Sequence, residues 1–212
     1  MAVLEELAAA LEGGRKKQVT SLISQALEEG FSAQEILNGG LLKGMSAVGE
    51  QFKNGEVFVP EVLIAARAMN AGTALLKPYL TQEGVEPIGK ACIGTVQGDL
   101  HDIGKNLVRM MLEGKGIQVV DLGVDVAPER FVECAVAESC GLICCSSLLS
   151  ITMPVMERVV EDAKRAGIRE RVKIMVGGAP VTQEFCDSIG ADAYTPDAAT
   201  AAEVAASLLG AR

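Results

Sequence analysis

From residue 90 onward, apolar runs of strand length alternate with segments of helical periodicity. The runs lie at 90–96, 117–122, 141–147, 172–176 and 191–194, and the helical patterns at 103–114, 128–139, 153–166, 181–188 and 197–210. Because the runs are apolar throughout, the strands they form must be covered on both faces, which is typical of a parallel sheet between two layers of helices. This half is therefore predicted to be an α/β domain. Its ligands should bind at the carboxyl ends of the strands.

The preceding half of the chain is predicted to be helical throughout. Apolar residues recur at helical spacing in four segments, which are expected at 4–11, 19–30, 32–53 and 60–76. Ser32 and Glu35 form a capping box at the start of the third segment, and Pro60 suits the first turn of the fourth. Four helices with short links predict an antiparallel bundle. The pair Gly39-Gly40 inside the third helix costs ~1 kcal/mol at each position, which indicates a kink or a close approach by something flat.

The two halves meet at residues 83–89, a short stretch that contains Gly84, Pro87 and Gly89. We therefore expect a helical domain at 1–86 and an α/β domain at 87–212.

Charge and composition exclude several classes of protein. The formal net charge of −9 argues against nucleic acid as a partner, because phosphate binding needs a basic surface. No apolar run approaches the ~18–20 residues of a membrane span, and the acidic start lacks the features of a signal peptide. These features predict a cytoplasmic protein with no membrane partner. The six cysteines form no Cys-x-x-Cys pair and are interpreted as buried, reduced thiols.

The single histidine of the chain, His101, lies in the loop after the first predicted strand. Asp99 precedes it by two residues and Asp102 follows it directly. A carboxylate on the second ring nitrogen is the usual environment of a metal-ligating histidine. Alternatively, His101 only marks the start of the helix that begins near Ile103, with Asp102 as its N-cap. Zinc is not expected, since further ligands would have to come from scattered cysteines, and no Gly-x-Ser-x-Gly or phosphate-binding loop is present.

Two further loops follow the third and fourth strands. The segment from Ser146 to Thr152 contains four hydroxyl residues, and Gly177-Gly178 leaves room for a ligand against the backbone. Each signal is weak alone, because serine-rich loops are usually turns and helix caps. Together with the histidine loop they predict a polar slot below His101.

The combination Asp99-x-His101-x-x-Gly104, Ser146-x-Leu148 and Gly177-Gly178 resembles the cobalamin-binding fingerprint of B12-dependent methyltransferases and mutases. Residues 55–69 are similar to the helical cap module that precedes the Rossmann-like domain of methionine synthase and of small corrinoid proteins. The resemblance covers essentially the whole chain. It implies a four-helix bundle cap followed by a Rossmann-like (flavodoxin-like) domain with a five-stranded parallel sheet.

The resemblance also implies a cofactor and its ligands. A cobalamin or related corrinoid would lie between the two domains in the base-off, histidine-on state, with His101 as the axial ligand of cobalt through Nε2. His101, Asp99 and Thr152 would form the family's ligand triad, and Phe58, Leu63 and Met69 would cap the upper face. The remaining expected contacts, including the slot for the nucleotide tail, are Gly98, Asp102, Ile103, Gly104, Ser146, Leu148, Ser150, Gly177 and Gly178.

The function implied is that of a methyl carrier, whose cobalt cycles between Co(I) and methyl-Co(III). One methyltransferase would load the methyl group from a methoxyaromatic compound, a methylamine or methanol. A second would pass it to tetrahydrofolate, tetrahydromethanopterin or a thiol such as coenzyme M, and a reductive activase would restore Co(I). The chain is not expected to be catalytic alone. The alternatives are the cobalamin subunit of an adenosylcobalamin-dependent mutase, which typically lacks the helical cap, and a B12 sensor, which needs an output segment.

Overall fold

The computed structural model describes residues 2–210 and divides into two compact units. The first unit runs to Pro87 and also includes Gly114–Gly116, and the second contains the other residues from Ile88 onward. The first unit is helical, and the second is an α/β domain, so the predicted fold class is confirmed. Within the described residues, none of the helices combines the length and apolar character that crossing a membrane would require.

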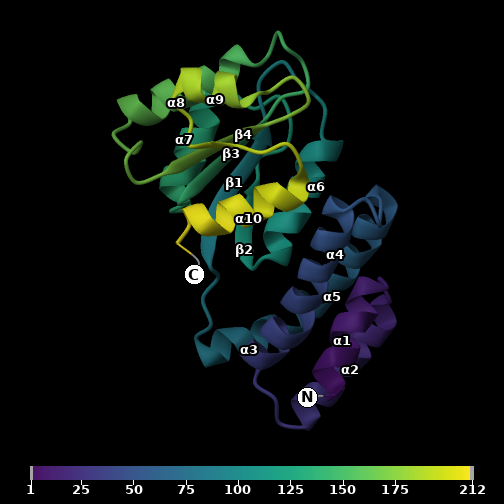
Figure 1. The fold of residues 1–212 in the computed structure, drawn as a ribbon. Coiled ribbons are helices and arrows are strands. Elements are labelled where there is room, and N and C mark those ends of the chain that lie inside the picture. Colours follow the sequence, from purple (N-terminus) through teal and green to yellow (C-terminus); the bar gives the residue numbers. More distant parts are fainter. Residues whose placement is uncertain (1, 211–212) are drawn as a thin grey trace. The chain divides into compact units, whose positions relative to one another are not determined.

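The helical unit contains four helical rods among its described residues. They are α1 (Ala2–Glu12), α2 (Lys16–Glu28), a continuous rod made of α3 (Ala33–Ile36), the π-helical segment η1 (Leu37–Leu42) and α4 (Lys43–Lys53), and α5 (Val59–Glu83) (Figure 1). The expected capping box is present, since the Ser32 hydroxyl accepts from the Glu35 N–H and the Glu35 carboxylate accepts from the Ser32 N–H.

The Gly39-Gly40 pair lies in the π-helical segment, where it lets α1 approach closely. A Cβ at position 39 would lie 3.1 Å from the Leu4 side chain, and one at position 40 would lie 2.4 Å from that of Leu7. The sequence predicted a kink or a close approach by something flat, whereas the close neighbour is helix α1 of the same unit. The backbone adapts by a local widening of the helix rather than by ending it.

Helix α5 is longer than its sequence pattern predicts. The expected end near Leu76 is wrong, because the helix continues through Pro78 to Glu83 and ends at Gly84, which adopts the left-handed conformation of a C-cap. A proline removes one backbone donor from a helix, but the rest of this last turn remains helical around it. The link to the next unit is therefore only residues 84–88.

The α/β unit is a five-stranded parallel sheet with the strand order β2-β1-β3-β4-β5. Each expected strand and helix is present with its ends shifted by a few residues at most. The strands are β1 (Gly89–Thr95), β2 (Ile117–Asp121), β3 (Leu142–Ser146), β4 (Lys173–Gly177) and β5 (Ala193–Tyr194), and the helices are α6 (Ile103–Gly114), α7 (Pro128–Ala137), α8 (Pro154–Arg165), α9 (Gln183–Ile189) and α10 (Ala198–Leu208).

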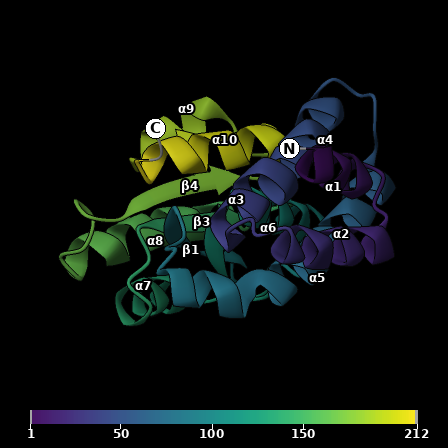
Figure 2. The same ribbon diagram turned by 90° about the horizontal axis from the view of Figure 1, so that it is seen from below.

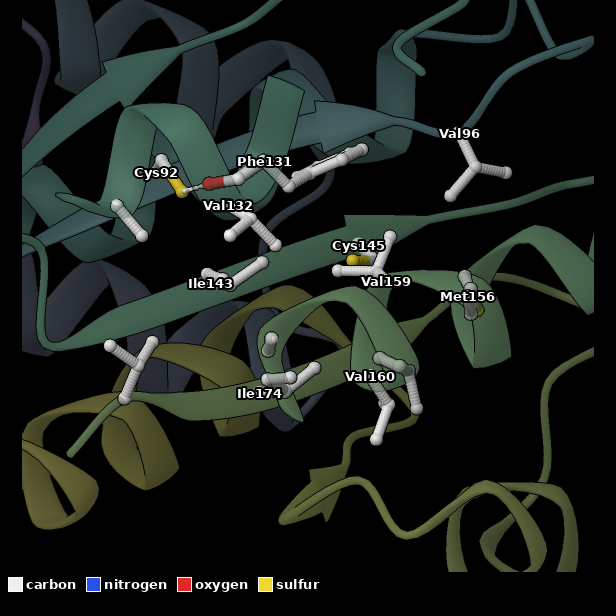
Figure 3. Close-up of a cluster of buried hydrophobic side chains, with 14 of the residues drawn as sticks. Cys92, Val96, Phe131, Val132, Ile143, Cys145, Met156, Val159, Val160 and Ile174 are labelled. Carbon is white, nitrogen blue, oxygen red and sulfur yellow. Dashed lines mark hydrogen bonds between the residues drawn. The ribbon is translucent and has the colours of Figure 1, made fainter. Parts of the chain in front are cut away.

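Both faces of the sheet are covered, as the continuous apolar strands require. Right-handed crossovers place α7 and α8 on one face and α6 on the other. Helix α10 follows the last strand, and Figure 2 shows it on the face of the sheet opposite α7. On the α7 side, Phe131 and Val132 of α7 and Val159 and Val160 of α8 pack over Ile143 and other buried strand residues (Figure 3). This core fixes the strand ends that carry the functional loops.

Candidate functional site

The functional loops diverge at the centre of the sheet. The chain goes from β1 outward to β2, and it returns to β3 on the other side of β1. The loops after β1 and β3 therefore leave neighbouring strand ends in different directions, which is the usual ligand position in open α/β sheets. These are the loops that contain His101 and Thr152.

Asp99 ties these two loops together. Its side chain is completely buried. Oδ1 accepts from the backbone N–H of His101 at 3.0 Å and faces the His101 Nδ1 at 2.6 Å. Oδ2 accepts from the N–H groups of Leu148 and Leu149 at 2.6 and 3.2 Å. One carboxylate thus fixes the histidine loop against the loop after β3.

Asp99 is ionised in this environment. Burial on its own would raise the pKa, but the N–H groups of His101, Leu148 and Leu149 and the His101 ring hydrogen-bond to the charged form and lower the pKa to about 2. The carboxylate is therefore available as a permanent acceptor for the His101 ring.

The lowered pKa of Asp99 predicts how the free energy of unfolding depends on pH. A carboxyl group whose pKa falls on folding stabilises the protein above its ordinary pKa of 3.8, and this contribution disappears as the pH falls toward about 2. We expect Asp99→Asn to lower the free energy of unfolding by ~1–2 kcal/mol at neutral pH, and the difference from wild type to narrow below pH ~4. Urea unfolding of wild type and of the variant between neutral pH and about pH 2 measures this difference in the free energy of unfolding. A difference that stays constant with pH would contradict the lowered pKa of Asp99.

His101 is held by one ring nitrogen and has the other left for a ligand. Its side chain is 54% exposed, and Nδ1 faces Asp99, so the nitrogen available outside this pair is Nε2. The Thr95 hydroxyl donates to the His101 carbonyl at 2.7 Å and fixes the backbone as well. A ring oriented by a carboxylate on one side is suited to ligate a metal on the other.

Thr152 completes the predicted triad at longer range. Its Oγ1 lies 3.4 Å from Asp99 Oδ2 and 2.8 Å from the Leu149 carbonyl oxygen. Ser147, which the sequence analysis did not single out, is fully buried beside it, with its Oγ 2.8 Å from Thr152 Oγ1 and 3.0 Å from the same carbonyl. The hydroxyl network behind Asp99 therefore has two members, and its only sequence signal was the richness of 146–152 in hydroxyl residues.

Gly177, the last residue of β4, and Gly178, which follows it, lie against this network. Ser146 pairs in register with Gly177, and the Ser147 N–H donates to the Gly177 carbonyl at 3.1 Å. Gly178 has a φ of +132°, and a Cβ there would lie 1.8 Å from the Ser147 carbonyl oxygen. The fold itself thus requires glycine at position 178. Ser150, the remaining residue of the predicted slot, is exposed on the loop after β3.

The other predicted residues of the histidine loop have different surroundings. Gly98 donates its N–H to the carboxylate of Asp125 at 2.7 Å, so Asp125 in the loop after β2 is a second supporting residue that the sequence analysis missed. The Asp102 carboxylate accepts from the Asn106 side chain at 3.0 Å. A Cβ on Gly104 would meet no atom within 4 Å, so this glycine borders open space.

Large apolar side chains are exposed at the ends of the two loops that Asp99 joins. Ile151 is 85% exposed, Ile103 76% and Leu100 72%, and Leu148 and Leu149 are exposed as well. Apolar groups gathered in this way normally mark a binding surface. The loops therefore combine an imidazole nitrogen that is available to a ligand with exposed apolar side chains, an arrangement that suits a large, mostly apolar metal complex.

The three predicted cap residues of the helical unit have different environments. Phe58, which precedes α5, is 67% exposed, whereas Met69 is 4% exposed and belongs to the core of its unit. Leu63 is half-buried. Phe58 thus offers apolar surface to a ligand, and Met69 offers almost none.

The chain has relatives among known proteins. One family model, described as a B12 binding domain, matches residues 89–206. A second model with the same description matches residues 3–77. The chain is 38% identical to a corrinoid protein of Desulfitobacterium hafniense over 99% of both chains. It is 41% identical to dimethylamine corrinoid protein 1 of Methanosarcina acetivorans over 98% of this chain and 97% of the relative. It is 46% identical to trimethylamine corrinoid protein 1 of the same organism over 80% of each.

Solved structures lead to the same family. The methanol:cobalamin methyltransferase complex MtaBC of Methanosarcina barkeri contains a chain that matches with a TM-score of 0.88 and 27% identity, over 100% of this chain and 81% of that one. A cobalamin-binding protein of D. hafniense matches with a TM-score of 0.81 and 30% identity over 98% of both. The chain therefore belongs to the B12-binding corrinoid proteins of methylamine and methanol methyltransferase systems.

Proposed function

We propose that this chain is a methyl carrier that holds its corrinoid base-off, with His101 Nε2 as the lower ligand of cobalt. When bound, the cobalt of the corrinoid supplies the chemistry by accepting a methyl group and releasing it to an acceptor. The observation that carries the proposal is the pair of Asp99 and His101. The buried, ionised carboxylate holds Nδ1 at 2.6 Å and leaves Nε2 in a half-exposed ring.

The residues around the pair fit a corrin. Leu100, Ile103 and Ile151 would contact the apolar edges of the macrocycle with side chains that are now in water. A side chain at position 104 would meet no other atom of the chain within 4 Å. A cofactor lying against this position would explain why glycine stands there. Ser146, Ser150 and Gly177 are the candidates for contact with the nucleotide tail, and Gly178 shapes that region by packing on Ser147.

The protein's own part in the reaction is to set how readily His101 binds and leaves the cobalt. Asp99 accepts the second ring N–H of His101, which makes Nε2 a stronger donor and holds the ring in place. Thr152 and Ser147 act one step behind, by orienting hydroxyl groups near Asp99 and the Leu149 carbonyl. These residues are positioning residues rather than ligands.

Replacing Asp99 with asparagine should weaken His101 ligation while the corrinoid stays bound. We expect the ligation constant to fall ~10–100-fold, the usual cost of losing a partner behind a metal ligand, and its pH dependence to change because a charged acceptor is gone. Thr152→Ala should act in the same direction by less than about tenfold, because it removes one neutral hydrogen bond. The visible spectrum of the bound corrinoid, titrated from acid to alkaline pH, separates the histidine-on and histidine-off forms.

Asp102→Asn is the matched control for Asp99→Asn. Asp102 is also a neighbour of His101 in sequence, but its carboxylate contacts Asn106 instead of the ring. Its titration should coincide with that of wild type. If Asp99→Asn also titrates like wild type, Asp99 only shapes the loop and the proposed tuning role is wrong.

The donor we propose is a methylamine. Support comes from the relatives named for dimethylamine and trimethylamine, at 41% and 46% identity. The partner that loads the protein would then be a methylamine-specific methyltransferase, with a second methyltransferase and a reductive activase completing the cycle.

The donor is tested with the reconstituted, reduced holoprotein and purified donor methyltransferases of each class. Loss of the reduced corrinoid absorbance should occur with the enzyme for dimethylamine or trimethylamine and its substrate. The methanol enzyme with methanol serves as the parallel reaction. Loading by the methanol enzyme alone would overturn the choice of donor, and loading by none of them would overturn the carrier function with these donors.

A further inference from the structure

A second group of potential metal ligands lies inside the α/β unit. Cys92 in β1, Cys134 in α7 and Cys140 in the turn before β3 bring their sulfur atoms within 4.8 Å of one another. All three side chains are buried, and all are free thiols. Figure 3 shows Cys92 between the sheet and α7, with its thiol directed to the Phe131 carbonyl oxygen at 3.8 Å.

This convergence does not extend to the other thiols. Cys144 and Cys145 are adjacent in β3 and therefore point to opposite faces of the sheet, and Cys186 lies in α9. Within residues 2–210 the three cysteines are the one group of at least three histidine, cysteine, aspartate or glutamate side chains whose ligand atoms come this close. The site therefore offers three sulfur donors and no oxygen or nitrogen donor from these residue types.

The donor set determines which ion fits. A metal at the centre of three thiolates, with metal–sulfur bonds of ~2.3 Å, holds the sulfur atoms about 4 Å apart. The cluster reaches this spacing by contracting less than about 1 Å. Zn²⁺ normally takes a fourth ligand, which this buried group does not provide. Thiolates alone favour soft cations, among them Cu(I).

We propose that Cys92, Cys134 and Cys140 form a buried three-sulfur site for a soft cation of low coordination number, namely Cu(I). Binding displaces the thiol protons to solvent and involves no change in the oxidation state of copper or sulfur. Loading would tie the C-terminal end of α7 and the start of β3 to β1.

A cation lies close to the cluster in sequence and in the sheet. Lys90 stands two residues before Cys92 in β1 and pairs at 3.0 Å with Glu138, which stands two residues before Cys140. The positive charge of Lys90 would offset part of the negative charge that thiolate ligands bring to this end of the sheet.

The test uses the full-length protein with its corrinoid held as Co(II), reduced thiols and no oxygen. Cu(I) is titrated in competition with a coloured Cu(I) chelator, and copper X-ray absorption counts the sulfur ligands of the bound ion. We expect one Cu(I) per chain with three sulfur ligands. We also expect the melting temperature to rise by about 5–10 °C when free Cu(I) exceeds its Kd a hundredfold, since the ion binds only the folded protein.

Matched variants assign the site. Cys134→Ala and Cys140→Ala should each reduce the number of sulfur ligands and weaken Cu(I) binding at least about tenfold. Cys144→Ala and Cys186→Ala remove equally buried thiols outside the cluster and should leave both quantities unchanged. The ligand count in wild type keeps the test valid if a variant does not fold. Fewer than three sulfur ligands in wild type, or copper retained unchanged in both cluster variants, would overturn the proposal.

Discussion

His101→Ala should abolish the nitrogen hyperfine splitting in the EPR spectrum of the Co(II) holoprotein. The unpaired electron of base-off Co(II) lies along the axis of the lower ligand, so a coordinated nitrogen splits each cobalt line. In wild type we expect that nitrogen to be Nε2, because Nδ1 is held by Asp99. Without the imidazole, this splitting should be lost completely, which makes it one of the two largest effects predicted for this chain.

The sequence makes this experiment selective. His101 is the only histidine in 212 residues, so growth on ¹⁵N-histidine labels a single side chain. The triplet from ¹⁴N should become a doublet in the labelled wild-type protein. His101→Gln preserves a polar side chain of similar length and is the control for a general disturbance of the loop. If the splitting instead follows labelling of the cofactor's own base, the corrinoid is bound base-on and the proposed ligand is wrong.

The strands and helices of the α/β unit were predictable from the sequence because each one follows from a local pattern of apolar residues. Each strand is a short apolar run, and each following helix begins with a recognisable change of periodicity, so the ends agree within a few residues. Helix α5 was the exception. The expected end was near Leu76, but the helix continues through Pro78 and ends at Gly84. The partner of Gly39-Gly40 was also unpredictable, because the contact with Leu7 joins two separate helices.

The residues of the candidate site also fall into those that the sequence predicts and those that it does not. Asp99 and His101 are two residues apart and their pairing follows from a local motif, which the sequence displays directly. Ser147 and Asp125 support the site through contacts between loops that follow different strands. No local pattern identifies such a residue, because its role depends on which loops the sheet brings together. The cap residues show a further limit, since helical spacing alone does not separate the exposed Phe58 from the buried Met69.

Replacing Gly178 with alanine should destabilise the α/β unit severely. The added Cβ would lie 1.8 Å from the Ser147 carbonyl oxygen, which is backbone and has no side chain to rotate away, and the φ of +132° is strained for any other residue. We expect a loss of ~3–5 kcal/mol in the free energy of unfolding and a melting temperature lower by about 10 °C or more. Thermal unfolding without corrinoid measures this effect on the fold alone.

Two other glycines of the site separate the demands of the fold from those of the cofactor. At Gly177 an added Cβ would make an ordinary 3.6 Å contact with the Thr195 carbonyl oxygen, so Gly177→Ala should unfold within a few degrees of wild type. At Gly104 the Cβ would meet nothing, and Gly104→Ala should keep the stability of the apoprotein. It should nevertheless weaken corrinoid binding, because the proposed cofactor lies against that loop. If Gly178→Ala melts like Gly104→Ala, the close packing of Gly178 on Ser147 is wrong, and with it the support for the hydroxyl network behind Asp99.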